Sequence, residues 1–200
     1  MDNRTQLENL KKEISKMNLP LKKGATRLVF GEGNSNAKVF CLGEGPGYWE
    51  DMKGIPFVGN AGKLLDSLFP LMGLTRDQVF ISNVVMYRPP ENRDPSPEEI
   101  AAFDPFIDQM IEIIKPKMII TLGRFSMAKF LPGVKISSVH GRRHNIQLGE
   151  RKVVVIPMYH PAAALRRGEV MNQIKADFAS LKSELEEIIN KKEIIQGSLV

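Results

Sequence analysis

The sequence predicts an α/β fold in which a mainly parallel sheet is covered by helices on both faces. Short apolar runs bounded by glycine, asparagine or proline alternate along the chain with segments whose apolar residues recur at helical spacing. This alternation is typical of parallel sheets, because each crossover helix packs on a face of the sheet. The 200 residues, 42% of them hydrophobic, suffice for a buried core, so we expect a single domain over residues 1–200.

The first predicted element is an amphipathic helix over residues 3–17, where apolar residues recur every three or four positions. Two short apolar runs, Leu28–Phe30 and Lys38–Leu42, are bounded by Gly and Asn and are predicted strands. Helical spacing returns over residues 62–72, with Asn60 as the expected N-cap.

The central part of the chain begins with a predicted strand at Val79–Val85 and a loop at Arg88–Pro97, which contains four prolines. A helix then starts at Ser96, because this serine can cap it, Pro97 suits its first position and two acids occupy its first turn. We expect this helix to end near Lys115.

Four more elements complete the prediction. Residues 117–122 read as a buried strand, 125–131 as a helix, 152–157 as another strand, and 171–191 as the closing helix. The unusual residues follow three of the strands, and the carboxyl ends of parallel strands meet at one edge of a sheet. The loops should therefore converge on one site.

A formal net charge of +5 favours a polyanionic partner without proving one. The arginines gather at turns: Arg88 and Arg93 flank the proline-rich loop, Arg142 follows a glycine, and Arg166 follows a His-Pro pair. Arginine in loops is well suited to binding phosphates. We therefore expect these four residues to contact DNA if the partner is nucleic acid.

No apolar run reaches the roughly 18 residues of a transmembrane helix, and the first sixteen residues lack the apolar stretch of a secretion signal. We expect a cytoplasmic protein without a membrane partner. The single cysteine, Cys41, lies in an apolar run and is expected to be a core residue. One thiol can form neither an intramolecular disulfide nor a four-cysteine iron–sulfur site.

The segment Gly43–Asp51 (GEGPGYWED) combines three glycines with a proline after a predicted strand. Such a turn exposes backbone amides that can hold an anion, but the carboxylates of Glu44 and Glu50 would repel a phosphate. An ordinary strand-to-helix turn is an equal alternative. A P-loop is excluded, because no Lys-Ser/Thr pair follows Gly47.

Four side chains have both a functional and a structural interpretation. Phe57 can stack on a flat ligand or belong to the core. Asn83, at a strand end, can pair with the edge of a base or satisfy a turn, and Asn92 can position a water or cap a turn. His160 precedes a proline after a predicted strand and should lie at the mouth of the site. No other His or Cys has ligand spacing to it, so no metal site is predicted.

The chain resembles the uracil-DNA glycosylase superfamily, and most closely family 4, in the order and spacing of six segments: GEGPGYWED, GIPFVGNAGKLLD, ISNVV, YRPPENRDPSPEEI, KPKMIITLGR and YHPAAAL. The resemblance covers about residues 16–178. It implies a three-layer α/β/α fold with a central, mainly parallel four-stranded sheet. It also implies a monomeric, monofunctional glycosylase that flips deoxyuridine out of single- or double-stranded DNA and hydrolyses its N-glycosidic bond.

The resemblance implies a role for each candidate residue. It makes Glu44, Asn92 and His160 catalytic, assigns uracil binding to Gly43, Gly45, Glu50, Phe57 and Asn83, and places DNA contacts at Ala164, Leu165 and Arg166 beside the arginines named above. Phe57 would stack on uracil, Asn83 would pair with its amide edge, and His160 would donate a hydrogen bond to the oxygen that gains charge. Glu50 would exclude the methyl group of thymine, and either Glu44 or Asn92 would position the water. Leu165 would enter the gap left in the duplex.

The chain departs from family 4 at the four cysteines that normally hold an iron–sulfur cluster. The matching positions are Lys16, Leu19, Tyr87 and Phe103, so we expect no cofactor and expect apolar packing to replace the cluster. Two alternatives to uracil excision stay open: a uracil-DNA binding protein without turnover, and a glycosylase for another deaminated base such as hypoxanthine.

Overall fold

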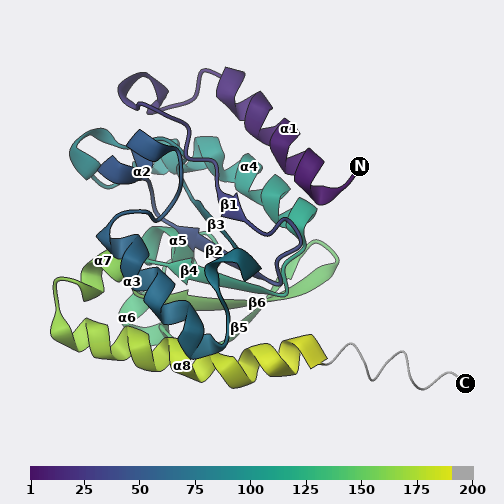
Figure 1. The fold of residues 1–200 in the computed structure, drawn as a ribbon, viewed down its shortest axis with the longest axis vertical. Helices are drawn as coiled ribbons and strands as arrows, with labels where there is room; N and C mark the ends of the chain where they lie inside the picture. Colours follow the sequence, from purple (N-terminus) through teal and green to yellow (C-terminus); the bar gives the residue numbers. More distant parts are fainter. Residues whose placement is uncertain (191–200) are drawn as a thin grey trace, which may run out of the picture.

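The computed structural model of the chain describes residues 1–190, and the strands in that range form one six-stranded sheet in the order β1-β3-β2-β4-β6-β5 (Figure 1). The strands are β1 (Glu32–Gly33), β2 (Val39–Gly43), β3 (Val79–Asn83), β4 (Met118–Leu122), β5 (His144–Leu148) and β6 (Arg151–Met158). The central four run parallel, as predicted, and β1 and β5 add antiparallel edges. The prediction of one domain over residues 1–200 extends into 191–200, which lie outside the described residues.

Helices cover both faces of the sheet, which confirms the three-layer prediction (Figure 1). Helices α1 (Asn3–Lys16) and α4 (Pro97–Ile114) contribute to the core on one face, whereas α3 (Asn60–Leu68) and α8 (Gly168–Asn190) contribute to the core on the other. Successive strand residues alternate between the two cores, as the pleat requires: Phe40 enters the first and Cys41 the second. Burial raises the pKa of the Cys41 thiol to about 12, which leaves it an inert core residue, as expected.

The remaining elements are short. The helices are α2 (Tyr48–Lys53), α5 (Arg124–Ala128), α6 (Ile136–Val139) and α7 (Pro161–Ala164), and the 3₁₀ turns are Lys22–Gly24, Phe69–Met72, Arg76–Gln78 and Pro90–Asn92. Several of these short elements follow the end of a parallel strand and lead into the helices that cover the sheet. None of the helices within residues 1–190 is long and apolar enough to span a bilayer.

The start of α4 confirms the predicted cap. Ser96 accepts a hydrogen bond from the amide of Glu99, and the Glu99 carboxylate accepts one from the amide of Ser96. This reciprocal pairing satisfies backbone donors that the first helical turn leaves unpaired.

One predicted strand and several predicted boundaries were wrong. Residues Leu28–Phe30 form no strand. Within the described residues, the amide of Val29 donates a hydrogen bond to the carbonyl of Met86, and the carbonyl of Phe30 accepts one from the Ser82 hydroxyl instead of from a neighbouring strand. The helix expected over 62–72 starts at Asn60 with Gly59 as its cap, and becomes a 3₁₀ turn at Phe69. The closing helix starts at Gly168 rather than Met171. Its expected end, Lys191, lies outside the described residues.

Candidate active site

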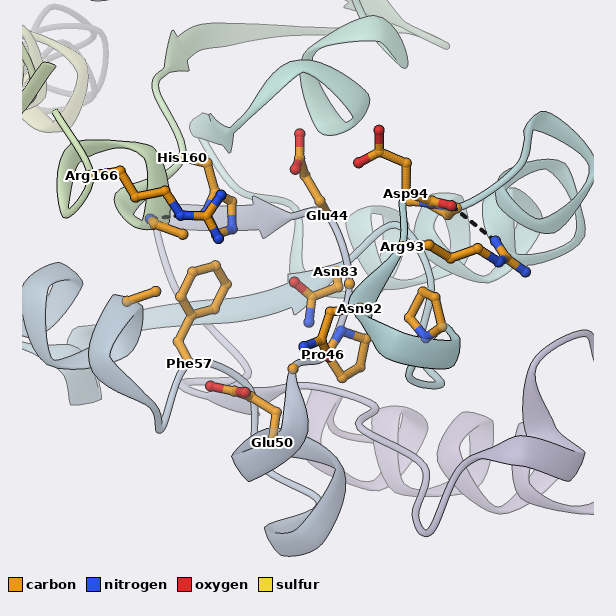
Figure 2. Close-up of a pocket in the computed structure, with 16 residues that line it drawn as sticks. Glu44, Pro46, Glu50, Phe57, Asn83, Asn92, Arg93, Asp94, His160 and Arg166 are labelled. Atoms are coloured by element: carbon orange, nitrogen blue, oxygen red, sulfur yellow. Dashed lines mark hydrogen bonds between the residues drawn. The ribbon is translucent and has the colours of Figure 1, made fainter.

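A cavity of about 330 Å³ opens where the loops after β2, β3 and β6 meet, which confirms that these loops converge (Figure 2). It is lined by Glu44, Gly45, Pro46, Gly47, Glu50, Phe57, Ala61, Asn83, Pro89, Asn92, Arg93, Asp94, Pro95, His160, Ala162 and Arg166. Most of the expected catalytic and uracil-binding side chains are therefore brought together. The cavity lies at the end of β2, which has β3 on one side and β4 on the other. The order of the strands along the chain reverses at this point, and ligands usually bind at such a position in parallel sheets.

Glu44 lines this cavity, and its surroundings set both the pKa and the position of its carboxylate. Burial raises the pKa of Glu44, and a hydrogen bond from the amide of Phe125 (3.1 Å) partly opposes that shift. A Cβ on Gly123, whose φ is +110°, would overlap the Glu44 carboxylate, so the close approach depends on glycine. The carboxylate is thus fixed and more basic than an exposed one.

Asn83 ends β3 as a buried residue, and its Oδ1 has no hydrogen-bond partner within the described part of the chain. An unsatisfied buried acceptor costs about 1–3 kcal/mol. The geometry around it depends on Gly43, since a Cβ there would overlap Asn83 Oδ1 and lie 2.7 Å from the ring of Phe57. The amide therefore keeps an unpaired acceptor for a ligand at the cavity wall.

Phe57 lies across the cavity with a φ of +53°, in the left-handed region that non-glycine residues rarely adopt. Glu50 holds the segment that follows Phe57, because its Oε1 accepts hydrogen bonds from the amides of Val58 (2.9 Å) and Gly59 (2.8 Å). One carboxylate thus both lines the cavity and fixes the loop that presents the phenyl ring.

Arg76 holds the same loop from outside the cavity. Its guanidinium donates to the carbonyls of Pro56 (2.6 Å) and Phe57 (3.2 Å), and it pairs with Asp66 (2.9 Å) and Glu32 (3.3 Å). Arg76 could not be predicted from the sequence, because a side chain that donates to backbone carbonyls leaves no pattern in it. Asp94, which was not predicted either, lines the cavity and forms an ion pair with Arg124. Its position in the proline-rich loop, directly after the predicted site residue Arg93, was a signal that could have found it.

His160 faces Phe57, with the ring centroids 5.7 Å apart and the planes 30° from parallel. Its Nδ1 accepts a hydrogen bond from the amide of Ala162 (3.1 Å). Burial lowers the pKa of His160 to about 4, an effect that nearby Arg166 adds to and Glu50 opposes. The ring is therefore neutral at pH 7, and its proton resides on Nε2, the nitrogen left to act as a donor.

Asn92 lies on the opposite wall in a turn with left-handed backbone, φ +55°. Its Oδ1 accepts a hydrogen bond from Arg88 Nε (2.8 Å), so this oxygen is already engaged. Arg93 lines the cavity, but both of its terminal nitrogens bond the Glu99 carboxylate (2.8 and 2.6 Å). Arg88 and Arg93 are thus more tightly bound within the protein than the sequence suggested.

Of the other expected DNA contacts, Arg166 lines the cavity, whereas the remaining three lie outside it. Leu165 is exposed, and Arg142 is exposed on the turn before β5. A DNA contact was expected at Ala164, but this last residue of α7 is buried in the core, where its methyl group is inaccessible to DNA.

The four positions expected to match the family's cysteines do not fit an iron–sulfur cluster, because their side chains offer no thiolate. Lys16 is exposed, Leu19 packs against the core under α1 and α4, and Tyr87 and Phe103 are buried in that core with ring centroids 6.1 Å apart. Nor do residues 1–190 contain a group of three His, Cys, Asp or Glu side chains that could hold a metal ion.

Comparisons with known proteins show the family to which the chain is similar. The family model of the "Uracil DNA glycosylase superfamily" matches residues 30–185. The chain is 43% identical over 183 residues to the type-4 uracil-DNA glycosylase of Sulfurisphaera tokodaii, which covers 88% of this chain and 83% of the relative. It is 41% identical over 182 residues to that of Archaeoglobus fulgidus (88% and 91%), and 44% identical over 163 residues to that of Saccharolobus solfataricus (78% and 76%).

Proposed function

Because the chain belongs to the uracil DNA glycosylase superfamily, we propose that it hydrolyses the N-glycosidic bond of deoxyuridine in DNA. The products are free uracil and an abasic site. Relatives that are more than 40% identical over most of their length carry the name uracil-DNA glycosylase. The observation that carries the proposal is the cavity itself, where the unpaired amide oxygen of Asn83 lies among the phenyl ring of Phe57, the neutral His160 and the buried carboxylate of Glu44.

Uracil recognition follows from shape and hydrogen bonding. A base inside a duplex is out of reach, so the nucleotide turns out of the helix into the cavity. Phe57 stacks on the flat ring. The Asn83 side chain pairs with the amide edge of uracil, its Oδ1 accepting from the ring N–H and its Nδ2 donating to the neighbouring carbonyl.

Bond cleavage leaves electron density on uracil and positive charge on the sugar. His160 donates Nε2–H to the uracil oxygen that gains negative charge, and a neutral ring is sufficient for this. Glu44 orients a water toward the sugar carbon and accepts its proton as the carbon–oxygen bond forms. We prefer Glu44 to Asn92 for this step, because Asn92 Oδ1 already accepts from Arg88.

Glu50 supplies selectivity against thymine. Two backbone amides hold its carboxylate at the cavity wall, so it cannot swing aside to admit a methyl group. The size of the pocket rather than a difference in hydrogen bonding then separates the two bases, whose amide edges are alike.

Arg166 contacts DNA phosphates at the mouth of the cavity, and Leu165 fills the gap left by the flipped nucleotide. The chain works without an iron–sulfur cluster, since it contains a single cysteine. A monomeric state, a cytoplasmic location and the use of both single- and double-stranded DNA stay predictions.

The test uses oligonucleotides with one uracil, treated with the purified protein and then with alkali to cleave abasic sites. We expect cleavage by the wild type and losses of about 10²–10⁴-fold for Glu44→Ala and His160→Ala. His144→Ala, which removes a histidine from the distant strand β5, is the matched control. A fully active His160→Ala variant would show that the site is misassigned.

The same assay addresses the two alternatives. DNA binding without cleavage at high enzyme concentration would favour a binding protein without turnover. Cleavage at hypoxanthine but not at uracil would favour a glycosylase for another deaminated base.

A further inference from the structure

The outward face of α2 carries two exposed aromatic rings at the rim of the cavity. Tyr48 is 49% exposed and Trp49 is 58% exposed, and their rings meet edge to face with centroids 5.1 Å apart. Their neighbours in sequence, Gly47 and Glu50, line the cavity. Large exposed aromatic side chains next to a pocket mark an interaction surface more often than chance.

Neither ring of this pair is buried in a hydrophobic core. The acidic residues of α2 are engaged within the protein: Asp51 is buried and accepts hydrogen bonds from the amides of Thr26 (2.8 Å) and Arg27 (3.2 Å), and Glu50 bonds the segment after Phe57. The helix therefore presents aromatic rather than acidic side chains to the solvent, which suits contact with a polyanion.

A cation completes the surface. The guanidinium carbon of Arg88 lies 5.2 Å from the centroid of the Tyr48 ring, and Arg88 Nε donates to Asn92 on the far wall of the cavity. Aromatic rings flanked by arginine are how proteins bind unpaired nucleic acid strands, since every base has a face for stacking and every linkage a charge. We call Tyr48, Trp49 and Arg88 the rim platform.

We propose that the rim platform binds an unpaired base of the uracil-containing strand, next to the flipped nucleotide. Trp49 stacks on that base, the Tyr48 ring supports Trp49 edge to face, and Arg88 neutralises the phosphate of the base. This inference rests on the proposed function. In a duplex the neighbouring bases are already stacked and paired, so the platform acts on single-stranded DNA and gives the protein a preference for it.

A spectroscopic test is available because Trp49 is the only tryptophan in the sequence. Its fluorescence is measured during titration of the Glu44→Gln variant with uracil-containing single strands, the same duplex and a uracil-free single strand. We expect a shift in intensity or wavelength with the uracil-containing single strand that is larger than with the duplex. Binding by that strand, detected by the anisotropy of a dye on the DNA, without any change in Trp49 emission would overturn the proposal.

Kinetics provides a second test. Trp49→Ala should raise KM on single-stranded substrate by roughly 5- to 100-fold, the loss expected for one stacked base, while kcat and the KM on duplex change less than about twofold. Trp49→Phe keeps an aromatic face and should recover most of the affinity. Leu71→Ala, which removes an exposed apolar side chain away from the cavity, is the control and should match the wild type. Equal losses on both substrates, or no loss on either, would overturn the platform.

These results separate the two proposals. If the wild type excises no uracil but Trp49 responds to single strands, the proposed function fails and the platform stands. If excision is normal and the Trp49→Ala variant behaves as the wild type, only the platform fails. A change from dimer to monomer in Trp49→Ala by analytical ultracentrifugation, with DNA binding intact, would assign the surface to a second copy of the chain and would also overturn the proposal.

Discussion

Burial shifts the pKa values of two titratable side chains in one cavity in opposite directions. Burial disfavours the charged form of each, so it raises the pKa of Glu44 and lowers that of His160 to about 4. The first shift makes a better base, and the second keeps an uncharged hydrogen-bond donor at neutral pH. Residue types and loop positions made both residues predictable as site members. Their protonation states were not, because these depend on burial and on bonds such as that from Ala162 to His160 Nδ1.

The state of Glu44 should appear in the pH dependence of excision. Glu44 acts as a base only when ionised, so kcat falls as the pH drops through its pKa, which lies above the ordinary value of 4.5. Glu44→Gln should lower kcat by about 10²-fold or more and remove this acidic limb. The measurement is single-turnover excision from pH 4 to pH 8. An unchanged acidic limb in the variant would assign the limb to another group.

His160 should make stability depend on pH. Its pKa is about 4 in the folded protein and near 6.5 when unfolded, so between these values the unfolded chain binds more protons. The free energy of unfolding therefore decreases as the pH falls from about 6.5 to about 4. Urea unfolding at several pH values should show a shallower decrease for His160→Gln. If the matched variant His144→Gln flattens the dependence equally, the effect does not belong to His160.

At the scale of elements, the sequence predicted those with a strong local signal. The central strands are continuous apolar runs, and Ser96–Glu99 is a capping box, so both were found. Strand β5 was missed because its face alternates between partly buried and exposed residues, and α2 because its six residues lie within a motif dominated by glycine. The start of α3 depends on a close approach to the preceding loop, since a Cβ at Gly62 would overlap the carbonyl of Phe57.

The loop that presents Phe57 is held by two charged groups, and Arg76 should be a positioning residue. Arg76→Ala frees the carbonyls of Pro56 and Phe57, which allows the strained backbone to relax and displaces the phenyl ring. We expect kcat/KM to fall roughly 10- to 100-fold, mostly through kcat. Arg76→Lys, which can still donate to one carbonyl, should recover part of the loss.

Steady-state kinetics and thermal unfolding on the same samples check this prediction. Arg151→Ala serves as the control, because it removes an arginine paired with Glu112 on another part of the surface. A loss of stability without a change in kcat would mean that Arg76 stabilises the fold only.

At the scale of the whole molecule, one core contains three of the four positions expected to match the cysteines of family 4. Leu19, Tyr87 and Phe103 bring the segment after α1, the end of the β3 region and α4 into the same apolar cluster. The sequence indicated which positions had changed, and the structure adds that two of the replacements are buried aromatic rings in contact. How such rings pack could not be derived from the sequence, because it depends on the surrounding side chains in three dimensions.

Removal of one of these two rings should therefore lower the free energy of unfolding by as much as the truncation of any other large core side chain. Phe103 is fully buried, so Phe103→Ala should lower the free energy of unfolding by about 3–5 kcal/mol, whereas Phe103→Leu should cost under about 2 kcal/mol. Urea denaturation measures both. A small effect for Phe103→Ala would mean that the ring does not hold these segments together. Iron analysis of the purified wild type should give no stoichiometric metal, and iron at four atoms per chain would contradict the assignment.

The single buried thiol has a consequence for the life of the protein in the cell. Cys41 is sealed in the core and stays protonated, and the chain has no other cysteine to lose. If the iron analysis confirms that the protein holds no cluster, we expect the glycosylase to need no cluster-assembly machinery after translation and to have no metal centre that molecular oxygen or peroxide could destroy. We then expect uracil excision by protein expressed in iron-depleted medium to equal that of protein expressed with iron, whereas excision by a cluster-dependent relative would fall.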